Sequence, residues 1–144
     1  MMIDSFNDVS KWVATEVVTG MPSFVCFVGF EGLTPPFTAG VNEKKRAAVI
    51  KFFITVGQYC RKLQNYNALM AIVAGLNGSA VHRLKKSWDL VPPKKLAAFE
   101  ELQAATSQQN NYATLRNLLH TADPPCIPYL GMYLTDLTFI EVIC

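Results

Sequence analysis

The side chains that could carry out chemistry are few and scattered along this sequence. The only two histidines, His82 and His120, have no candidate metal ligand at short spacing, whereas metal sites need clustered Cys, His or carboxylate groups. The sequence contains neither the phosphate loops GxxxxGK[ST] and GxGxxG nor the nucleophile elbow GxSxG. We therefore expect no catalytic residue, no metal site and no cofactor.

The basic pairs of the chain raise a separate question about nucleic acid. Lys85-Lys86 and Lys94-Lys95 flank Trp88, and cations around an aromatic side chain are typical of single-strand binding. The net charge of the 144 residues is only +2, however, which is too small to favour nucleic acid from composition. Nucleic-acid binding therefore remains only an alternative interpretation. The favoured expectation is that the chain has no nucleic-acid partner.

The composition is that of one folded domain. Hydrophobic residues make up 51% of the chain, which excludes a mainly disordered protein. Charged residues make up only 17%, against about a quarter in a typical soluble domain. This deficit indicates apolar surface that normally contacts something else.

The sequence shows no sign of export or membrane insertion. Residues 1–8 lack the basic start of a signal peptide, and no apolar stretch reaches the roughly 18 residues of a membrane span. The four cysteines are far apart, without a CxxC pair, at Cys26, Cys60, Cys126 and Cys144. We expect a cytoplasmic protein with reduced thiols.

Apolar residues at helical spacing predict an all-α fold. The predicted helices cover residues 4–18, 43–64, 67–76, 94–105 and 111–119. Asn67 and Asn111 are expected to cap the third and fifth of these helices. The β-branched and aromatic tail, residues 127–144, is expected to be extended or loop structure packed on the helices.

Residues 19–42 fit neither a helix nor an obvious strand. Gly and Pro occur in this stretch at a density that interrupts any regular element. One interpretation is an inserted loop with a short strand-like piece, since loops of this length are uncommon in compact domains. The other is a segment foreign to the parent fold.

Four blocks of the sequence carry a family resemblance. They are FNDVSKWVATE at residues 6–16, NYNALMAIVAGLN at 65–77, SAVHRLKKSW at 79–88 and DPPCIPYLGMYLTDLTFIE at 123–141. In order and spacing, these blocks resemble the catalytic domain of Ras-family guanine-nucleotide exchange factors. Most of the residues in them fit scaffold roles, such as helix ends, a buried indole and a proline-stiffened crossing.

The resemblance implies an all-helical bowl that grips a small GTPase of the Ras, Rap or Ral type. Such a factor performs no covalent chemistry and is not an enzyme in that sense. It binds the nucleotide-free GTPase more tightly than the loaded one, and so favours GDP release. The protein would reach membranes through its GTPase.

The resemblance also implies three GTPase-binding residues, Lys51, Phe99 and Tyr112. Each has an ordinary structural alternative. Lys51 could lie on a solvated helix face, Phe99 could be plain core, and Tyr112 could be core with its hydroxyl at the edge.

The sequence departs from the family pattern in three places. It stops after the TDLTFIE block, where the family continues with Glu-Gly-Asn-Pro and a helical hairpin that wedges open the GTPase switch. It also lacks the family's first helices and carries residues 19–42 in place of a short link. We therefore expect a single partial domain over residues 1–144, with an atypical insertion at 19–42 and impaired exchange in isolation. The alternative is a non-catalytic module that binds a GTPase or a sister factor.

Overall fold

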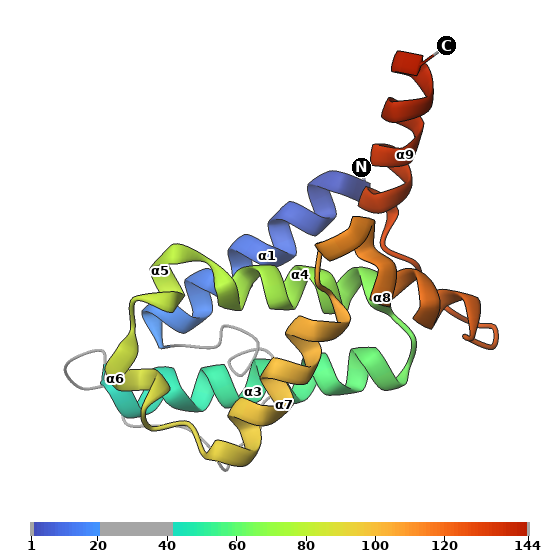
Figure 1. Cartoon of the computed structure of the whole chain (residues 1–144). Helices are drawn as coiled ribbons and strands as arrows, with labels where there is room; N and C mark the ends of the chain where they lie inside the picture. The colour runs from blue at the N-terminus through green and yellow to red at the C-terminus, as the bar shows by residue number, and fades with distance from the viewer. Residues whose placement is uncertain (1, 21–41, 144) are drawn as a thin grey trace.

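The computed structural model describes residues 2–20 and 42–143, and all regular structure in these residues is helical. Most of the predicted insertion, residues 21–41, lies outside the described part. The helices are α1 (Met2–Thr19), α3 (Glu43–Lys62), α4 (Tyr66–Asn77), α5 (Ser79–His82), α6 (Lys85–Trp88), α7 (Pro93–Ala105), α8 (Gln109–His120) and α9 (Leu130–Ile143) (Figure 1). The all-α prediction is confirmed.

Helix α4 lies at the centre of the packing, between α1 and α3 (Figure 1). Leu69, Ile72 and Leu76 on this helix are almost fully buried. A β-carbon built on Gly75 would lie 2.7 Å from the Ser10 carbonyl oxygen and 2.8 Å from Val13 Cβ. The absence of a side chain at Gly75 therefore permits the close approach of α1 to α4.

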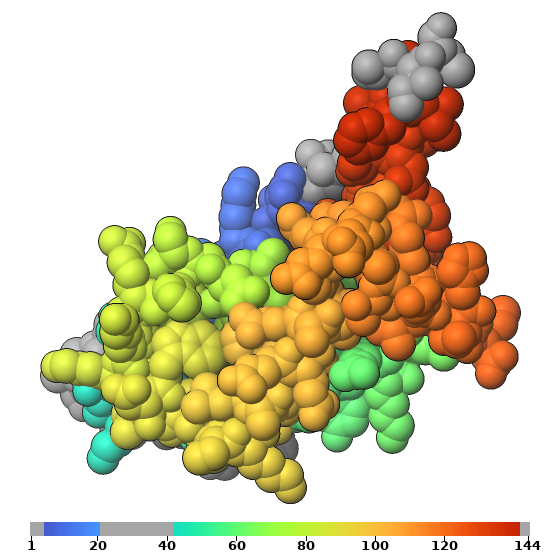
Figure 2. All heavy atoms as spheres, in the orientation of Figure 1, coloured from blue at the N-terminus to red at the C-terminus, as the bar shows by residue number. Residues whose placement is uncertain are grey.

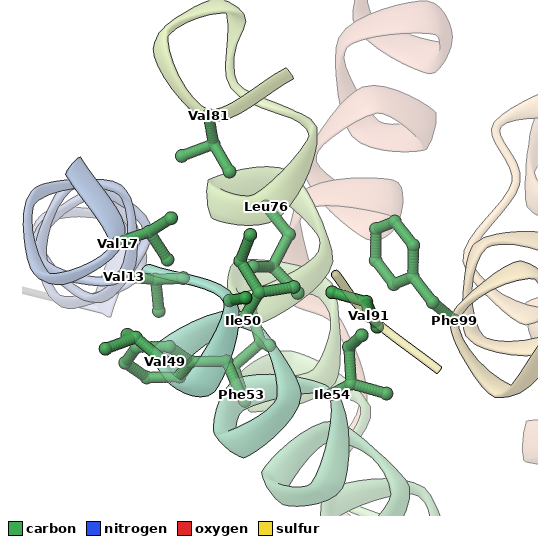
Figure 3. Packing of buried hydrophobic residues seen from close by; sticks show 12 residues of the cluster. Val13, Val17, Val49, Ile50, Phe53, Ile54, Leu76, Val81, Val91 and Phe99 are labelled. Atoms are coloured by element: carbon green, nitrogen blue, oxygen red, sulfur yellow. The ribbon is translucent and has the colours of Figure 1, made fainter. Parts of the chain in front are cut away.

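The buried side chains form two clusters. The first contains Val13, Val17, Val49, Ile50, Phe53, Ile54, Leu76, Val81, Val91 and Phe99 among its members (Figure 3). The second joins α4 to α7, α8 and α9 and contains Tyr66, Leu69, Met70, Val73, Leu102, Leu115 and Met132. Because α4 contributes to both clusters, it couples the two halves of the domain.

The ends of α3 and α4 differ slightly from prediction. Helix α3 ends at Lys62, and Gln64 adopts a left-handed backbone with φ 57°. Asn65, rather than the predicted Asn67, caps α4, because its Oδ1 accepts a hydrogen bond from the Ala68 amide at 3.0 Å. The neighbouring Asn residues are both chemically suited to capping, and the position of the chain reversal selects Asn65.

The start of α8 contains an unusual turn. Asn110, Asn111 and Tyr112 have left-handed φ angles of 50°, 53° and 59°. The predicted cap at Asn111 is wrong, because its carbonyl accepts from Arg116 Nε at 2.8 Å and its Nδ2 donates to Asp136 at 3.3 Å. Asn tolerates the left-handed region better than most residues, which suits this position.

The expectation of an extended C-terminal tail is wrong beyond Tyr129, because Leu130–Ile143 forms α9. The threonines that lower helix propensity here bond back to the helix, with Thr135 Oγ1 donating to the Gly131 carbonyl at 3.0 Å. The preceding segment is extended as predicted. The Ile127 backbone forms hydrogen bonds with the backbones of Gln64 and Tyr66. These bonds hold the extended segment before α9 against the α3–α4 link.

We predict that Gly75→Ala destabilises the domain by about 1–3 kcal/mol, because the new methyl group meets the Ser10 backbone and Val13. Gly57→Ala is the matched control. Its methyl group would come too close only to the end of the Leu102 side chain, at 2.9 Å, while Leu69 and Ile72 lie at ordinary contact distances of 3.7 and 3.8 Å, and alanine favours the helix. We expect that variant to remain within about 1 kcal/mol of the wild type. Urea unfolding measures both, and equal stability of the two variants would contradict the account.

Candidate functional site

The three predicted GTPase-binding residues occupy different surroundings. Lys51 is partly exposed on α3. Phe99 on α7 is only 7% exposed and stacks on Trp88, with ring centroids 5.3 Å apart. Phe99 belongs to the first cluster, whereas Tyr112 packs against the second. The structure therefore does not gather Phe99 and Tyr112 in one cluster, and their roles at an interface stay predictions.

Tyr112 belongs to a group of three aromatic side chains, here called the tyrosine cluster. The ring of Tyr129 lies 5.8 Å from that of Tyr112 and 5.4 Å from that of Phe6. Burial raises the pKa of the Tyr129 phenol, and Tyr112 raises it further through its charge and a hydrogen bond. The phenol therefore remains a neutral hydrogen-bonding group at physiological pH.

A charged contact fastens α9 to α8 beside this cluster. Arg116 Nη2 donates to both carboxylate oxygens of Asp136, at 2.9 and 2.8 Å, and Asn111 Nδ2 donates to the same carboxylate. These hydrogen bonds hold the pKa of Asp136 below its ordinary value, with Arg116 as the largest cause. We call these three residues the α8–α9 clamp, and the left-handed turn places Asn111 within it.

Helix α9 projects from the body of the domain beside the start of α1 (Figures 1 and 2), and several of its apolar side chains are exposed. Five of them are between 42% and 63% exposed: Tyr133, Leu134, Leu137, Phe139 and Ile140. Monomeric proteins seldom leave so much apolar surface on one element in water. Helix α9 begins directly after Tyr129, a member of the tyrosine cluster.

A shallow groove between α3 and α7 has a volume of about 360 Å³. Its lining is mixed in charge, and Arg61 and Glu101 approach one another across it at 3.8 Å. The lining residues are Gln58, Arg61, Lys62, Ala98, Glu101 and Leu102. None of the predicted GTPase-binding residues lines this groove, so it does not define the site.

Trp88 is engaged within the fold. Its indole Nε1 donates to the Val81 carbonyl at 3.0 Å, and its ring stacks on Phe99. The indole that the sequence predicts to be buried is thus only partly buried, and its hydrogen bond to Val81 spans the turn between α5 and α6. The ring is therefore not presented as a platform on which a nucleic-acid base could stack.

Within residues 2–20 and 42–143, no three His, Cys, Asp or Glu side chains converge as metal ligands. No helix in this part of the chain is both long and apolar enough to cross a membrane. Cys60 and Cys126 are free thiols.

Sequence reasoning assigned no specific role to Tyr129, Arg116 or Asp136. A weak signal was present, because Asp136 is the one charged residue between Ile127 and Ile140. Such an isolated charge favours a specific partner, but the sequence does not show that the partner lies on the preceding helix. The segment around Ile127 runs across the α3–α4 link and so brings Asp136 on α9 to Arg116 on α8.

Comparison with known proteins identifies relatives across nearly the whole chain. Residues 1–143 match the family model described as RasGEF domain. Ras guanine nucleotide exchange factor E of Dictyostelium discoideum is 45% identical over 141 residues, covering 96% of the chain and 12% of that protein. Ras-specific guanine nucleotide-releasing factor 1 of Rattus norvegicus is 46% identical over 138 residues, covering 94% of the chain and 9% of that protein. The chain thus spans about a tenth of the length of these relatives.

We predict that Asp136→Asn loosens α9 at neutral pH, because the amide cannot replace the charged acceptor of Arg116. Hydrogen exchange of the α9 amides, corrected for intrinsic rates, measures this effect. Glu141→Gln is the matched control, since it removes one exposed carboxylate from the same helix.

The effect of Asp136→Asn has a defined pH dependence. The folded-state pKa of Asp136 is lowered, so the stabilisation is present above the ordinary aspartate pKa and is lost as the pH falls through the lowered value. The difference between wild type and Asp136→Asn should therefore vanish in strong acid. A difference that persists there, or an equal effect of Glu141→Gln, would contradict the assignment.

Proposed function

We propose that this chain, which belongs to the RasGEF domain family, promotes release of GDP from a Ras-family small GTPase. The observation that carries the proposal is the match of residues 1–143 to that family, together with relatives named as Ras guanine nucleotide exchange factors. The reaction makes and breaks no covalent bond. The chain would act by binding, as a single domain into which residues 19–42 are inserted.

The proposed mechanism rests on unequal affinity. A protein that binds the empty and GDP-loaded GTPase equally well cannot shift the balance between them. The chain must therefore make contacts that the opened nucleotide site permits and the closed one does not. Aromatic and apolar side chains suit this purpose, because their burial is favourable and demands shape complementarity.

The surface that we propose for these contacts combines the tyrosine cluster with the exposed apolar side chains of α9. Tyr112 and Tyr129 provide aromatic rings with polar ends, which are common at the energetic centres of interfaces. The α8–α9 clamp supports the proposal because it fixes the position of α9 relative to both rings. Leu137 and Phe139 would extend the contact along α9.

Lys51 and Phe99 enter the proposal in different ways. Lys51 is exposed enough to contact the GTPase directly. Phe99 is buried against Trp88 and would act as a positioning residue that holds α7 in place. We further propose a Ras, Rap or Ral type of GTPase and a cytoplasmic site of action, consistent with the resemblance of the four sequence blocks.

The exposed side chains of α9 favour a second candidate, a non-catalytic module that binds a GTPase or a sister factor. Apolar surface promotes association whether or not it discriminates between nucleotide states. A measurement of nucleotide release distinguishes the two functions.

We predict that the chain accelerates release of the fluorescent nucleotide mantGDP from one of Ras, Rap or Ral. The chain alone should act slowly, and a fusion to the helical hairpin of a relative should act faster. Tyr112→Ala should lower the accelerated rate by about tenfold to thirtyfold, the range of an aromatic interface centre. Tyr59→Ala is the control, because Tyr59 is exposed on α3 outside the tyrosine cluster.

The outcomes are separable. Association with a GTPase without release by either protein would favour the non-catalytic module. Failure to associate with any of the three GTPases would contradict exchange activity and GTPase binding alike, and would leave only the module that binds a sister factor. Circular dichroism of each variant confirms that a lost rate does not reflect unfolding.

A further inference from the structure

The end of the domain where α3 begins beside α6 carries a concentration of positive charge, here called the basic end. It holds nearly half of the chain's 13 lysines and arginines. Its cationic side chains are Lys44, Lys45, Arg46, Arg83, Lys85 and Lys86. The acidic side chains on the same elements are only Glu43 and Asp89. The basic end is therefore strongly positive in a protein that is nearly neutral overall.

The structure brings these residues together from distant parts of the sequence. Lys86 Nζ on α6 lies 3.5 Å from Glu43 Oε1 on α3, which neutralises one of the two acids. In Figure 2 the start of α3 (cyan) emerges beside α6 (yellow-green). Lys44 and Lys85 are exposed, and within the described part of the chain their side chains have no hydrogen bond or ion pair. Both ammonium groups are thus available to a partner.

The fold itself does not explain this arrangement. Lys44, Lys45 and Arg46 lie in the first turn of α3, where the helix dipole disfavours positive charge. Arg46 has a structural role, because its Nε donates to the Val18 carbonyl at 3.0 Å. Within residues 2–20 and 42–143, the Lys44 side chain has no comparable contact. A cation that opposes the dipole without a partner among these residues suggests an external anionic one.

We propose that the basic end binds an anionic lipid surface directly. Besides its cations, this end carries Leu90, which is 45% exposed two residues after α6. Cations beside an exposed apolar side chain suit a bilayer interface, where headgroups are charged and the underlying region is apolar. Nucleic acid fits less well, because Trp88 is engaged with Phe99 and Val81. The inference goes beyond the proposed function and needs no GTPase.

The expected effects follow from membrane electrostatics. Each lysine near an anionic bilayer strengthens binding by about fivefold. The attraction is also screened, since the Debye length falls from about 10 Å at about 0.1 M salt to about 3 Å at about 1 M. Binding should therefore depend on lipid charge, on salt and on specific lysines.

Co-flotation of the full chain with lipid vesicles tests the proposal. One set of vesicles contains phosphatidylcholine with about 30 mol % phosphatidylserine, and the other contains phosphatidylcholine alone. The double variant Lys44→Gln/Lys85→Gln leaves the Lys86–Glu43 pair intact. Lys11→Gln/Lys62→Gln is the matched control, because it removes the same charge from exposed lysines on α1 and at the end of α3.

We expect binding to the anionic vesicles only, with loss of that binding in high salt. The basic-end double variant should bind about 25-fold more weakly, and the control double variant should stay within about threefold of the wild type. Leu90→Ser should weaken vesicle binding without changing its salt dependence. Release of mantGDP in solution should be unaffected by Lys44→Gln/Lys85→Gln, which separates this inference from the proposed function.

Four results would overturn the inference. They are absence of binding to anionic vesicles, equal binding to neutral vesicles, an equal loss in the two double variants, and tighter binding to an RNA oligonucleotide than to vesicles at equal phosphate concentration. The last result would assign the basic end to nucleic acid.

Discussion

The close contact of α1 with α4 at Gly75 determines how the first helix packs against the rest of the domain. A β-carbon there would overlap both the Ser10 carbonyl oxygen and Val13, so the distance between the two helices is set by the missing side chain. Val13 and Val17 can then reach the first cluster, where both are fully buried. The same placement of α1 allows Phe6 to contact Tyr129. One glycine thereby links the core to the candidate site.

The candidate site is assembled from segments that are far apart in sequence. Phe6 comes from α1, Tyr112 from the left-handed turn of α8, and Tyr129 from the residue before α9. The backbone contacts of Ile127 with the α3–α4 link fix the segment that carries Tyr129. The contact of Arg116 Nη2 with both carboxylate oxygens of Asp136 then ties α9 to α8. A binding surface held in this way loses little conformational entropy on association, which favours a specific partner.

Much of the scaffold could be predicted from apolar spacing, and less of the site. The period of Val9, Val13 and Val17 correctly predicted α1, because one buried face imposes that spacing. The helix α9 was not predicted within the tail of residues 127–144, since it is apolar on several faces and shows no such period. Tyr112 was proposed for the site through family resemblance, and its role at an interface stays a prediction. The contact of Arg116 with Asp136 was not predicted. It depends on the path of the chain across the α3–α4 link, and no local sequence pattern encodes that path.

The proposed function requires this domain to distinguish an empty GTPase from a loaded one. Titration calorimetry under identical conditions can compare the affinity of the chain for nucleotide-free and GDP-bound forms of the same GTPase. We expect the nucleotide-free form to bind at least about 100-fold more tightly, which corresponds to about 2.7 kcal/mol of differential binding. Equal affinity for the two forms would contradict it, because such a protein could bind the GTPase but could not drive the release of GDP.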